Sequence, residues 1–163
     1  MIEIRNLIVI YQSSPVNIIA NRGIDLDIAS KGMKVITGPN GSGKSTLFKV
    51  LSGEIEPSAG EIKLKEKLIP KREIAKTLGN SIEYAKQDLL LNPEYSGAQH
   101  LKRSGTFDQS NHTKLLNQLE IKDYWHIPIN ELTRDIRQLV GIALTLLSNK
   151  PILLLDEPTK YLA

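Results

Sequence analysis

The stretch GPNGSGKS at residues 38–45 decides the fold, because it satisfies the pattern G-x-x-x-x-G-K-[ST]. The apolar run KVIT at 34–37 predicts a short strand immediately before it. After it, Leu47, Val50 and Leu51 recur at helical spacing. A strand, a glycine loop and a helix in this order indicate a phosphate-binding loop rather than a glycine-rich turn that fits the pattern by chance.

The residue types of this loop suit phosphate chemistry. Glycines let successive backbone N–H groups curl around a phosphate without a side-chain clash, and the helix N-terminus adds partial positive charge. We expect Lys44 to reach the β- and γ-phosphates of a nucleotide and the Ser45 hydroxyl to bind Mg²⁺. The predicted nucleotide contacts are Gly38, Pro39, Asn40, Gly41, Ser42, Gly43, Lys44, Ser45 and Thr46.

An acidic pair, Asp156 and Glu157, follows the apolar run ILLL at 152–155. A carboxylate at the end of a buried strand is placed to hold the water shell of Mg²⁺, and an adjacent one can polarise an attacking water. The alternative is a surface pair that caps a strand. The phosphate loop elsewhere in the chain favours the functional interpretation, in which Asp156 is a metal ligand and Glu157 is catalytic.

Composition excludes several classes of protein. The chain has 163 residues, the size of one domain, and it has no cysteine for a disulfide framework or a thiolate metal site. Its longest largely apolar run, at 139–147, is shorter than the roughly 20 residues that span a bilayer. The N-terminus lacks the features of a secretory signal, so we expect a cytoplasmic location. The basic cluster at 63–73 also holds two glutamates and favours a solvated surface, so no nucleic acid is expected as a partner.

Hydrophobic periodicity predicts an α/β fold. Alternation at residues 2–11 and 24–28 indicates strands of an N-terminal β lobe. The segment 88–131 is polar and helix-like, which predicts a mostly helical insert. A longer helix is expected from near Thr133, and ILLL is expected as a buried strand.

Together these segments resemble the ATP-binding domain of ABC transporters, a branch of the P-loop NTPases. GPNGSGKSTL resembles the Walker A segment of that family, ILLLDEPT resembles its Walker B segment, and YAKQD at 84–88 resembles its Q-loop. The resemblance implies a P-loop NTPase core with an N-terminal antiparallel β lobe and a helical insert. It implies one ABC-type domain over 1–163, with a β lobe and Walker A core at 1–87, the insert at 88–131, and the signature helix and Walker B strand at 132–163.

The resemblance also assigns roles to two further residues. Tyr11 corresponds to the aromatic residue that stacks on adenine, although a buried core tyrosine is the competing interpretation. Gln87 corresponds to the glutamine that contacts Mg²⁺ or the attacking water and links the insert to the core, with a solvated glutamine as the alternative. The cofactors implied are ATP and Mg²⁺.

The implied partners are a second ABC-type ATP-binding domain, in a head-to-tail homodimer or heterodimer, and a transmembrane transporter subunit. Through that subunit the chain is expected at the inner face of the membrane.

The signature segment of the family, LSGGQ, aligns with residues 132–136, LTRDI. Thr133 keeps a hydroxyl, but Arg134 and Asp135 replace two glycines that bind the γ-phosphate of the partner's ATP. Asp135 suits the start of its own helix, but it repels a phosphate by about 4 kcal/mol at ~4 Å and an effective dielectric constant near 20. Arg134 offsets this repulsion if its guanidinium reaches the phosphate.

The chain ends at Ala163, six residues after Glu157. The final strands of the family's sheet and its switch histidine lie further on in relatives, so a C-terminally truncated domain is expected. None of His100, His112 and His126 stands in the right order to replace that histidine, and all three are expected at the surface.

The leading functional hypothesis is an ATP-binding subunit of an ABC transporter that hydrolyses ATP. The alternatives are a nonhydrolytic or regulatory ATP-binding subunit, and an ABC-type ATPase of translation or DNA maintenance.

Overall fold

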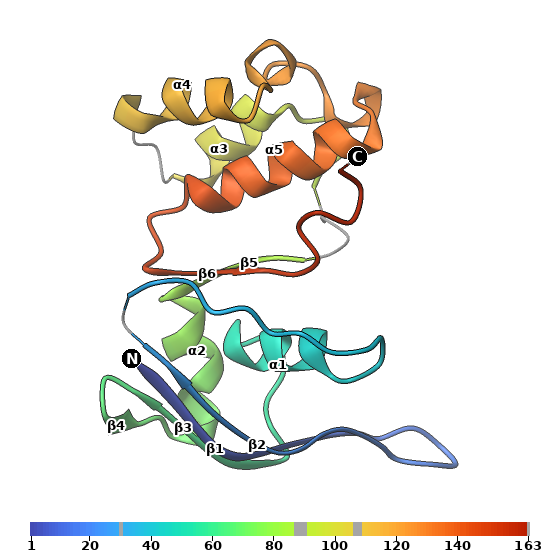
Figure 1. Ribbon diagram of the computed structural model, residues 1–163, viewed down its shortest axis with the longest axis vertical. Coiled ribbons are helices and arrows are strands. Elements are labelled where there is room, and N and C mark those ends of the chain that lie inside the picture. Colours follow the sequence, from blue (N-terminus) through green and yellow to red (C-terminus); the bar gives the residue numbers. More distant parts are fainter. Residues whose placement is uncertain (30, 87–90, 106–108, 163) are drawn as a thin grey trace. The chain divides into compact units, whose positions relative to one another are not determined.

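A computed structural model describes residues 1–29, 31–86, 91–105 and 109–162 (Figure 1). The chain forms two compact units, Met1–Ile82 and Glu83–Ala163. The first unit contains, in order, β1 (Ile2–Tyr11), β2 (Ile18–Ile28), α1 (Lys44–Leu51), β3 (Ala59–Leu64), β4 (Lys67–Leu68), the 3-10 helix η1 (Lys71–Glu73) and α2 (Ile74–Gly79).

The four strands of the first unit form one antiparallel sheet in the order β2-β1-β3-β4. Central strand β1 pairs Ile4 with Leu26 on one side and with Ile62 on the other. The buried residues of β1 form two alternating pairs, Ile2 with Ile4 and Leu7 with Val9, with a register shift between the pairs. Helices α1 and α2 lie on the same side of this sheet (Figure 1). The predicted N-terminal antiparallel β lobe is confirmed.

The prediction of a strand at residues 34–37 is wrong. Residues 33–39 have no regular secondary structure, and the side chains of Met33 and Val35 are 91% and 70% exposed. A strand this short needs a hydrogen-bonded neighbour, and none of the described strand pairs includes this segment. The phosphate loop therefore follows an irregular, exposed segment.

The second unit is mainly helical. Its strands β5 (Ile82–Ala85, which starts at the boundary) and β6 (Ile152–Leu155) form a two-stranded sheet. Between them lie α3 (Gly97–Ser104), α4 (Gln109–Gln118), the 3-10 helices η2 (Lys122–Tyr124) and η3 (Ile129–Glu131), and α5 (Arg134–Leu146). The elements from α3 to η3 confirm the helical character of the predicted insert, 88–131, over its described part.

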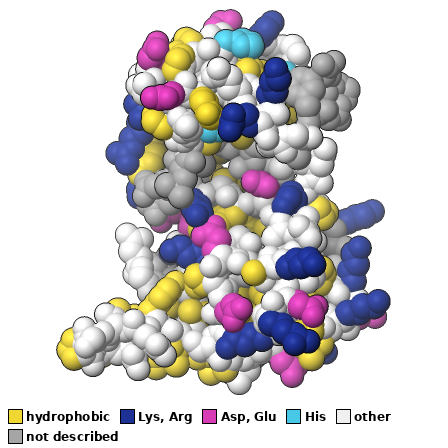
Figure 2. Space-filling view, turned by 180° about the vertical axis from the view of Figure 1, so that it is seen from behind, with side chains coloured by type: hydrophobic (Ala, Val, Ile, Leu, Met, Phe, Trp, Pro, Cys, Tyr) yellow, Lys and Arg dark blue, Asp and Glu magenta, His cyan; other side chains and the backbone are white. Residues whose placement is uncertain are grey.

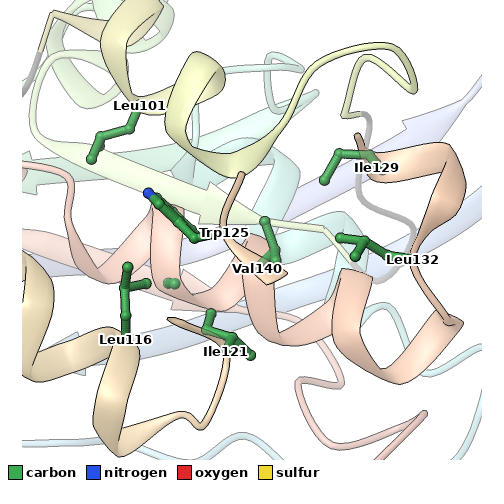
Figure 3. Close-up of a cluster of buried hydrophobic side chains, with 8 residues drawn as sticks. Leu101, Leu116, Ile121, Trp125, Ile129, Leu132 and Val140 are labelled. Atoms are coloured by element: carbon green, nitrogen blue, oxygen red, sulfur yellow. The ribbon is translucent and has the colours of Figure 1, made fainter. Parts of the chain in front are cut away.

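The core of this unit gathers around Trp125, which is 1% exposed (Figure 3). A Cβ atom at Gly97 would lie 2.6 Å from the indole ring, so this glycine lets α3 lie directly against it. The buried cluster comprises Leu101, Leu116, Ile121, Trp125, Ile129, Leu132, Val140 and Ala143. These residues hold α3, α4 and α5 together and fix the start of α5.

Two predictions for this unit need correction. Of the four residues of β6, only Leu154 is buried, because a two-stranded sheet covers little of either strand. His112 is half-buried and packs edge-on against Trp125, with the ring centroids 5.3 Å apart. His100 is also half-buried, whereas His126 is exposed as predicted. His112 shares the inward face of α4 with Leu116, one helical turn on.

None of the helices in the described part of the chain combines the length and apolarity needed to cross a membrane.

Candidate nucleotide-binding site

The glycine loop turns tightly into the start of α1. The N–H of Ser42 donates to the carbonyl of Pro39 over 3.2 Å, and Gly43 has a left-handed φ of 89°. A Cβ atom at Gly43 would lie 2.4 Å from the carbonyl oxygen of Ala20 in β2. The buried Asn21 side chain donates to the Gly43 carbonyl over 3.2 Å. Glycine is therefore required where β2 supports the loop.

Lys44, the first residue of α1, covers the loop with its side chain. Its Nζ donates to the carbonyl oxygens of Gly38 at 2.8 Å and of Pro39 at 3.0 Å. No acidic residue lies in the first turn of α1. A lysine ammonium and an uncompensated helix N-terminus thus share one loop, and both favour an anion.

Tyr11, the last residue of β1, lies beside this loop. Its side chain is 36% exposed, and its hydroxyl is 3.4 Å from that of Thr46. The alternative that Tyr11 is a core residue is therefore wrong. An exposed aromatic ring next to a phosphate loop is available for stacking; that role stays a prediction.

Apolar side chains also reach the surface over the β1–β2 hairpin (Figure 2), where Val16 and Ile18 are exposed.

Asp156 follows β6 in the second unit and is 5% exposed. Its backbone N–H donates to the carbonyl of Ala85 over 3.0 Å, which ties it to β5. The hydroxyl of Tyr84 donates to the carboxylate Oδ2 over 3.0 Å. An ionised carboxylate has about four acceptor sites, so this bond orients Asp156 and leaves it capacity for a cation. Sequence reasoning missed Tyr84, although it stands in the quoted YAKQD segment.

Glu157 adopts a left-handed backbone conformation with φ 47°, which is uncommon outside glycine and recurs at functional sites. Its Oε2 lies 3.6 Å from the Nζ of Lys160, and its carbonyl accepts from the Lys160 N–H over 3.1 Å. The pair is partly exposed, so the ion pair is weak and readily exchanged.

The altered signature segment lies at the start of α5, with Thr133 as its N-cap residue. The Nη2 of Arg134 donates to the hydroxyl of Tyr161 over 2.6 Å, and its Cζ lies 3.6 Å from the ring centroid. Asp135 has its pKa lowered from the ordinary value, first by a hydrogen bond with the Thr133 side chain and then by backbone N–H groups. Each charged residue of this segment is therefore engaged within the chain.

A second contact supports this arrangement. The buried Gln138 of α5 donates from Nε2 to the carbonyl of Pro158 over 3.3 Å. Neither Tyr161 nor Gln138 was found from the sequence, because no motif marks a contact between segments this far apart. Gln87 lies outside the described residues.

A family model described as ABC transporter matches residues 21–160. The cytochrome c biogenesis ATP-binding export protein CcmA of Brucella abortus is 33% identical over 132 residues, which cover 77% of this chain and 57% of that protein. The taurine import ATP-binding protein TauB of Yersinia pestis is 33% identical over 160 residues, 97% of this chain and 61% of that protein. The chain thus spans less than two thirds of the length of either relative.

Among solved structures, the dimeric structure of MJ0796, a bacterial ABC transporter cassette, superposes with a TM-score of 0.85. The match covers 100% of this chain and 76% of that chain at 24% identity, which shows the fold alone. The structure of cbiO1 from Clostridium perfringens gives a TM-score of 0.76 at 27% identity and covers 99% of this chain and 67% of that chain. The predicted fold class is confirmed.

Proposed function

Because the chain belongs to the ABC transporter family of nucleotide-binding cassettes, we propose that it is an ATP-binding subunit that hydrolyses Mg-ATP to power a membrane partner. The single observation that supports this best is the phosphate loop. The close approach of β2 to this loop requires a glycine at position 43. The Lys44 ammonium lies over the loop and donates to two of its carbonyl oxygens. Phosphate oxygens are stronger acceptors for that ammonium than neutral carbonyls.

ATP is proposed to bind through residues 38–46. Lys44 exchanges its two carbonyl acceptors for oxygens of the β- and γ-phosphates, while the N–H groups at the start of α1 face the same charge. Adenine is proposed to stack on Tyr11. The contact between the hydroxyls of Tyr11 and Thr46 supports this role, since it places the ring beside the first turn of α1.

The residues present fit Mg²⁺, which proteins usually hold through one or two carboxylates together with substrate phosphates. The proposed ligands are the Ser45 hydroxyl, the Asp156 carboxylate and Gln87. No cage of three histidine, cysteine or acidic side chains is found among the residues that the structure describes, and this mode of binding needs none. When bound, the ion supplies positive charge that neutralises the phosphates during transfer. Tyr84 orients Asp156 for this task.

Glu157 is proposed to accept a proton from the attacking water, with Gln87 positioning that water. The Glu157 carboxylate first has to leave Lys160, and a partly exposed pair costs little to separate.

The partners proposed are a second ABC-type domain, in a homodimer or heterodimer, and a transmembrane transporter subunit. Both units described above are proposed to act as one ATP-binding domain over 1–163. The relatives named above are an export protein and an import protein, so their names agree on transport and differ in its direction. A position at the inner face of the membrane follows from the proposed partner.

A nonhydrolytic or regulatory subunit is the second candidate. It is favoured by one observation, the engagement of Arg134 by Tyr161 and of Asp135 by Thr133. A signature segment whose charged side chains are engaged by other residues of the same chain offers little to the phosphate of a second subunit.

The test is a titration of the chain with a fluorescent ATP analogue in the presence of Mg²⁺. Lys44→Ala should abolish binding, whereas Lys49→Ala, in the last turn of the same helix, should bind like the parent. Equal affinity of Lys44→Ala and parent would refute the proposal. Release of phosphate from bound ATP by the parent, in a dimer, separates the hydrolytic function from the regulatory one.

A further inference from the structure

The helical unit contains a cavity that has no part in the proposed nucleotide site. Its volume is about 430 Å³, and it opens between α3, α4 and the segment around Trp125. The lining residues are Ala98, Leu101, Lys102, His112, Trp125 and His126. An apolar wall with a few polar groups is the usual composition of a small-molecule site.

Trp125 contributes a buried hydrogen-bond donor to this unit. Its ring is 1% exposed, and its Nε1 has no hydrogen-bond partner among the described residues. Figure 3 shows this nitrogen on the side of the ring that faces Leu101, another lining residue. An indole N–H only donates, and a buried donor without an acceptor costs free energy.

The polar side chains of the cavity select the charge of a ligand. Lys102, exposed in the last turn of α3, carries three donors and no acceptor. His112 has its pKa lowered by burial and, to a lesser extent, by the nearby His126. None of the six described lining residues is acidic. The lowered pKa of His112 favours its neutral form, so Lys102 supplies the positive charge beside an apolar surface.

We propose that this cavity binds a small amphipathic carboxylate. The apolar body of the ligand packs against Leu101, Ala98 and the edge of Trp125. Its carboxylate pairs with Lys102 and gives the indole N–H an acceptor. A carboxylate matches this set because it accepts hydrogen bonds without donating any, and a charge-assisted bond is stronger than a neutral one.

Trp125 is the only tryptophan of the chain, so its fluorescence reports directly on the cavity. The chain is titrated with decanoate and, as the neutral match, with decanol, both below the concentrations at which they aggregate. Decanoate should give a saturable change, with decanol about ten-fold weaker, the loss expected for one charge-assisted bond.

Lys102→Gln should weaken decanoate about ten-fold and leave decanol unchanged, since only the charged bond is removed. Lys114→Gln is the matched control, because Lys114 is an exposed lysine of α4 that does not line the cavity. Ala98→Phe should fill the cavity and abolish the response to both ligands, with thermal unfolding recorded to check that this variant folds.

Three results would each overturn the proposal. They are equal affinity for decanoate and decanol, an unchanged decanoate affinity in Lys102→Gln, and the absence of any saturable change in the parent.

Discussion

The guanidinium of Arg134 lies over the ring of Tyr161, with its Cζ 3.6 Å from the ring centroid and its Nη2 2.6 Å from the hydroxyl. This contact joins the start of α5 to the segment that follows β6. Gln138 repeats the connection one turn along α5 through the carbonyl of Pro158. The altered signature segment is therefore fixed to the residues that follow the acidic pair. We expect a substitution in one of these two segments to affect the structure of the other.

Two substitutions at Tyr161 separate the parts of this contact. Tyr161→Phe keeps the ring and loses the hydrogen bond, and it should lower the free energy of unfolding by about 0.5–1.5 kcal/mol. Tyr161→Leu loses the cation–π contact as well, which should lower the free energy of unfolding by about 0.5–1 kcal/mol more. Urea unfolding of the two variants measures both steps. If both unfold at the same urea concentration as the parent, the contact does not stabilise the fold.

The hydrogen bond from Thr133 lowers the pKa of Asp135, so Thr133→Val should raise that pKa towards its ordinary value. The folded pKa lies below the unfolded one. The contribution of Asp135 to stability is therefore present above the unfolded pKa, near 3.9, and is lost as the pH falls through the folded pKa. An NMR titration of the carboxyl carbon measures the shift. An unchanged pKa in Thr133→Val would assign the effect to the helix N-terminus instead.

Tyr11→Ala should weaken ATP binding by about 1–3 kcal/mol, the scale of base–aromatic stacking. Tyr11→Phe should bind like the parent, because the contact of the tyrosine hydroxyl with Thr46 is long at 3.4 Å and contributes little. Nucleotide titrations check both variants, with circular dichroism to confirm folding. Parent-like binding by Tyr11→Ala would exclude the stacking role.

Asp156→Asn should remove the Mg²⁺-dependent part of ATP affinity, since an amide offers a cation a neutral oxygen in place of a charged one. Tyr84→Phe should cause a smaller loss, because it frees the orientation of the carboxylate without removing it. Asp123→Asn, an exposed acidic residue of η2, is the control. ATP titrations with and without Mg²⁺ measure this part of the affinity. If Mg²⁺ raises the ATP affinity of Asp156→Asn as much as that of the parent, Asp156 is not a metal ligand.

The sequence predicted those elements whose own periodicity carries the signal. Alternation places Ile2 and Ile4 on the buried face of β1, and the spacing of Val140 and Ala143 marks the inward face of α5. It did not predict α2, a six-residue helix that buries only Ile74 and Leu78, too few positions to display a period. The phosphate loop was recognisable because its residue pattern lies within eight consecutive positions, although Ala20 and Asn21 of β2 also constrain Gly43.

Features that depend on distant partners were not predictable. Residues 34–37 have strand-like composition, but the described strand pairs leave them without a neighbour. The burial of His112 depends on its contact with Trp125, which belongs to another segment of the chain. Likewise, the sequence showed that Arg134 and Asp135 replace glycines, but not that Tyr161 and Thr133 engage them.

In the proposed dimer, Arg134 and Asp135 form the half-site that meets the γ-phosphate of the partner's ATP. In the structure the Arg134 guanidinium is bound to Tyr161, so its positive charge is not available to offset the negative charge of Asp135. The Asp135 carboxylate stays at the start of α5. A carboxylate about 4 Å from a phosphate repels it by roughly 4 kcal/mol at an effective dielectric constant near 20. A homodimer would then pair two competent phosphate loops with two poor signature segments, and its hydrolysis should be slow.

Replacing both residues tests this expectation. Arg134→Gly with Asp135→Gly should raise steady-state ATP turnover of the homodimer by roughly 10²–10³, the effect of one preorganised donor on a developing charge. Asp135→Gly alone should account for most of the gain, because it removes the repulsion and leaves Arg134 on Tyr161. ATP-dependent dimerisation, followed by light scattering in a Glu157→Gln background, gives a second readout that needs no turnover. If the double variant is no faster and dimerises no better, Arg134 leaves Tyr161 to perform the work of the missing glycines.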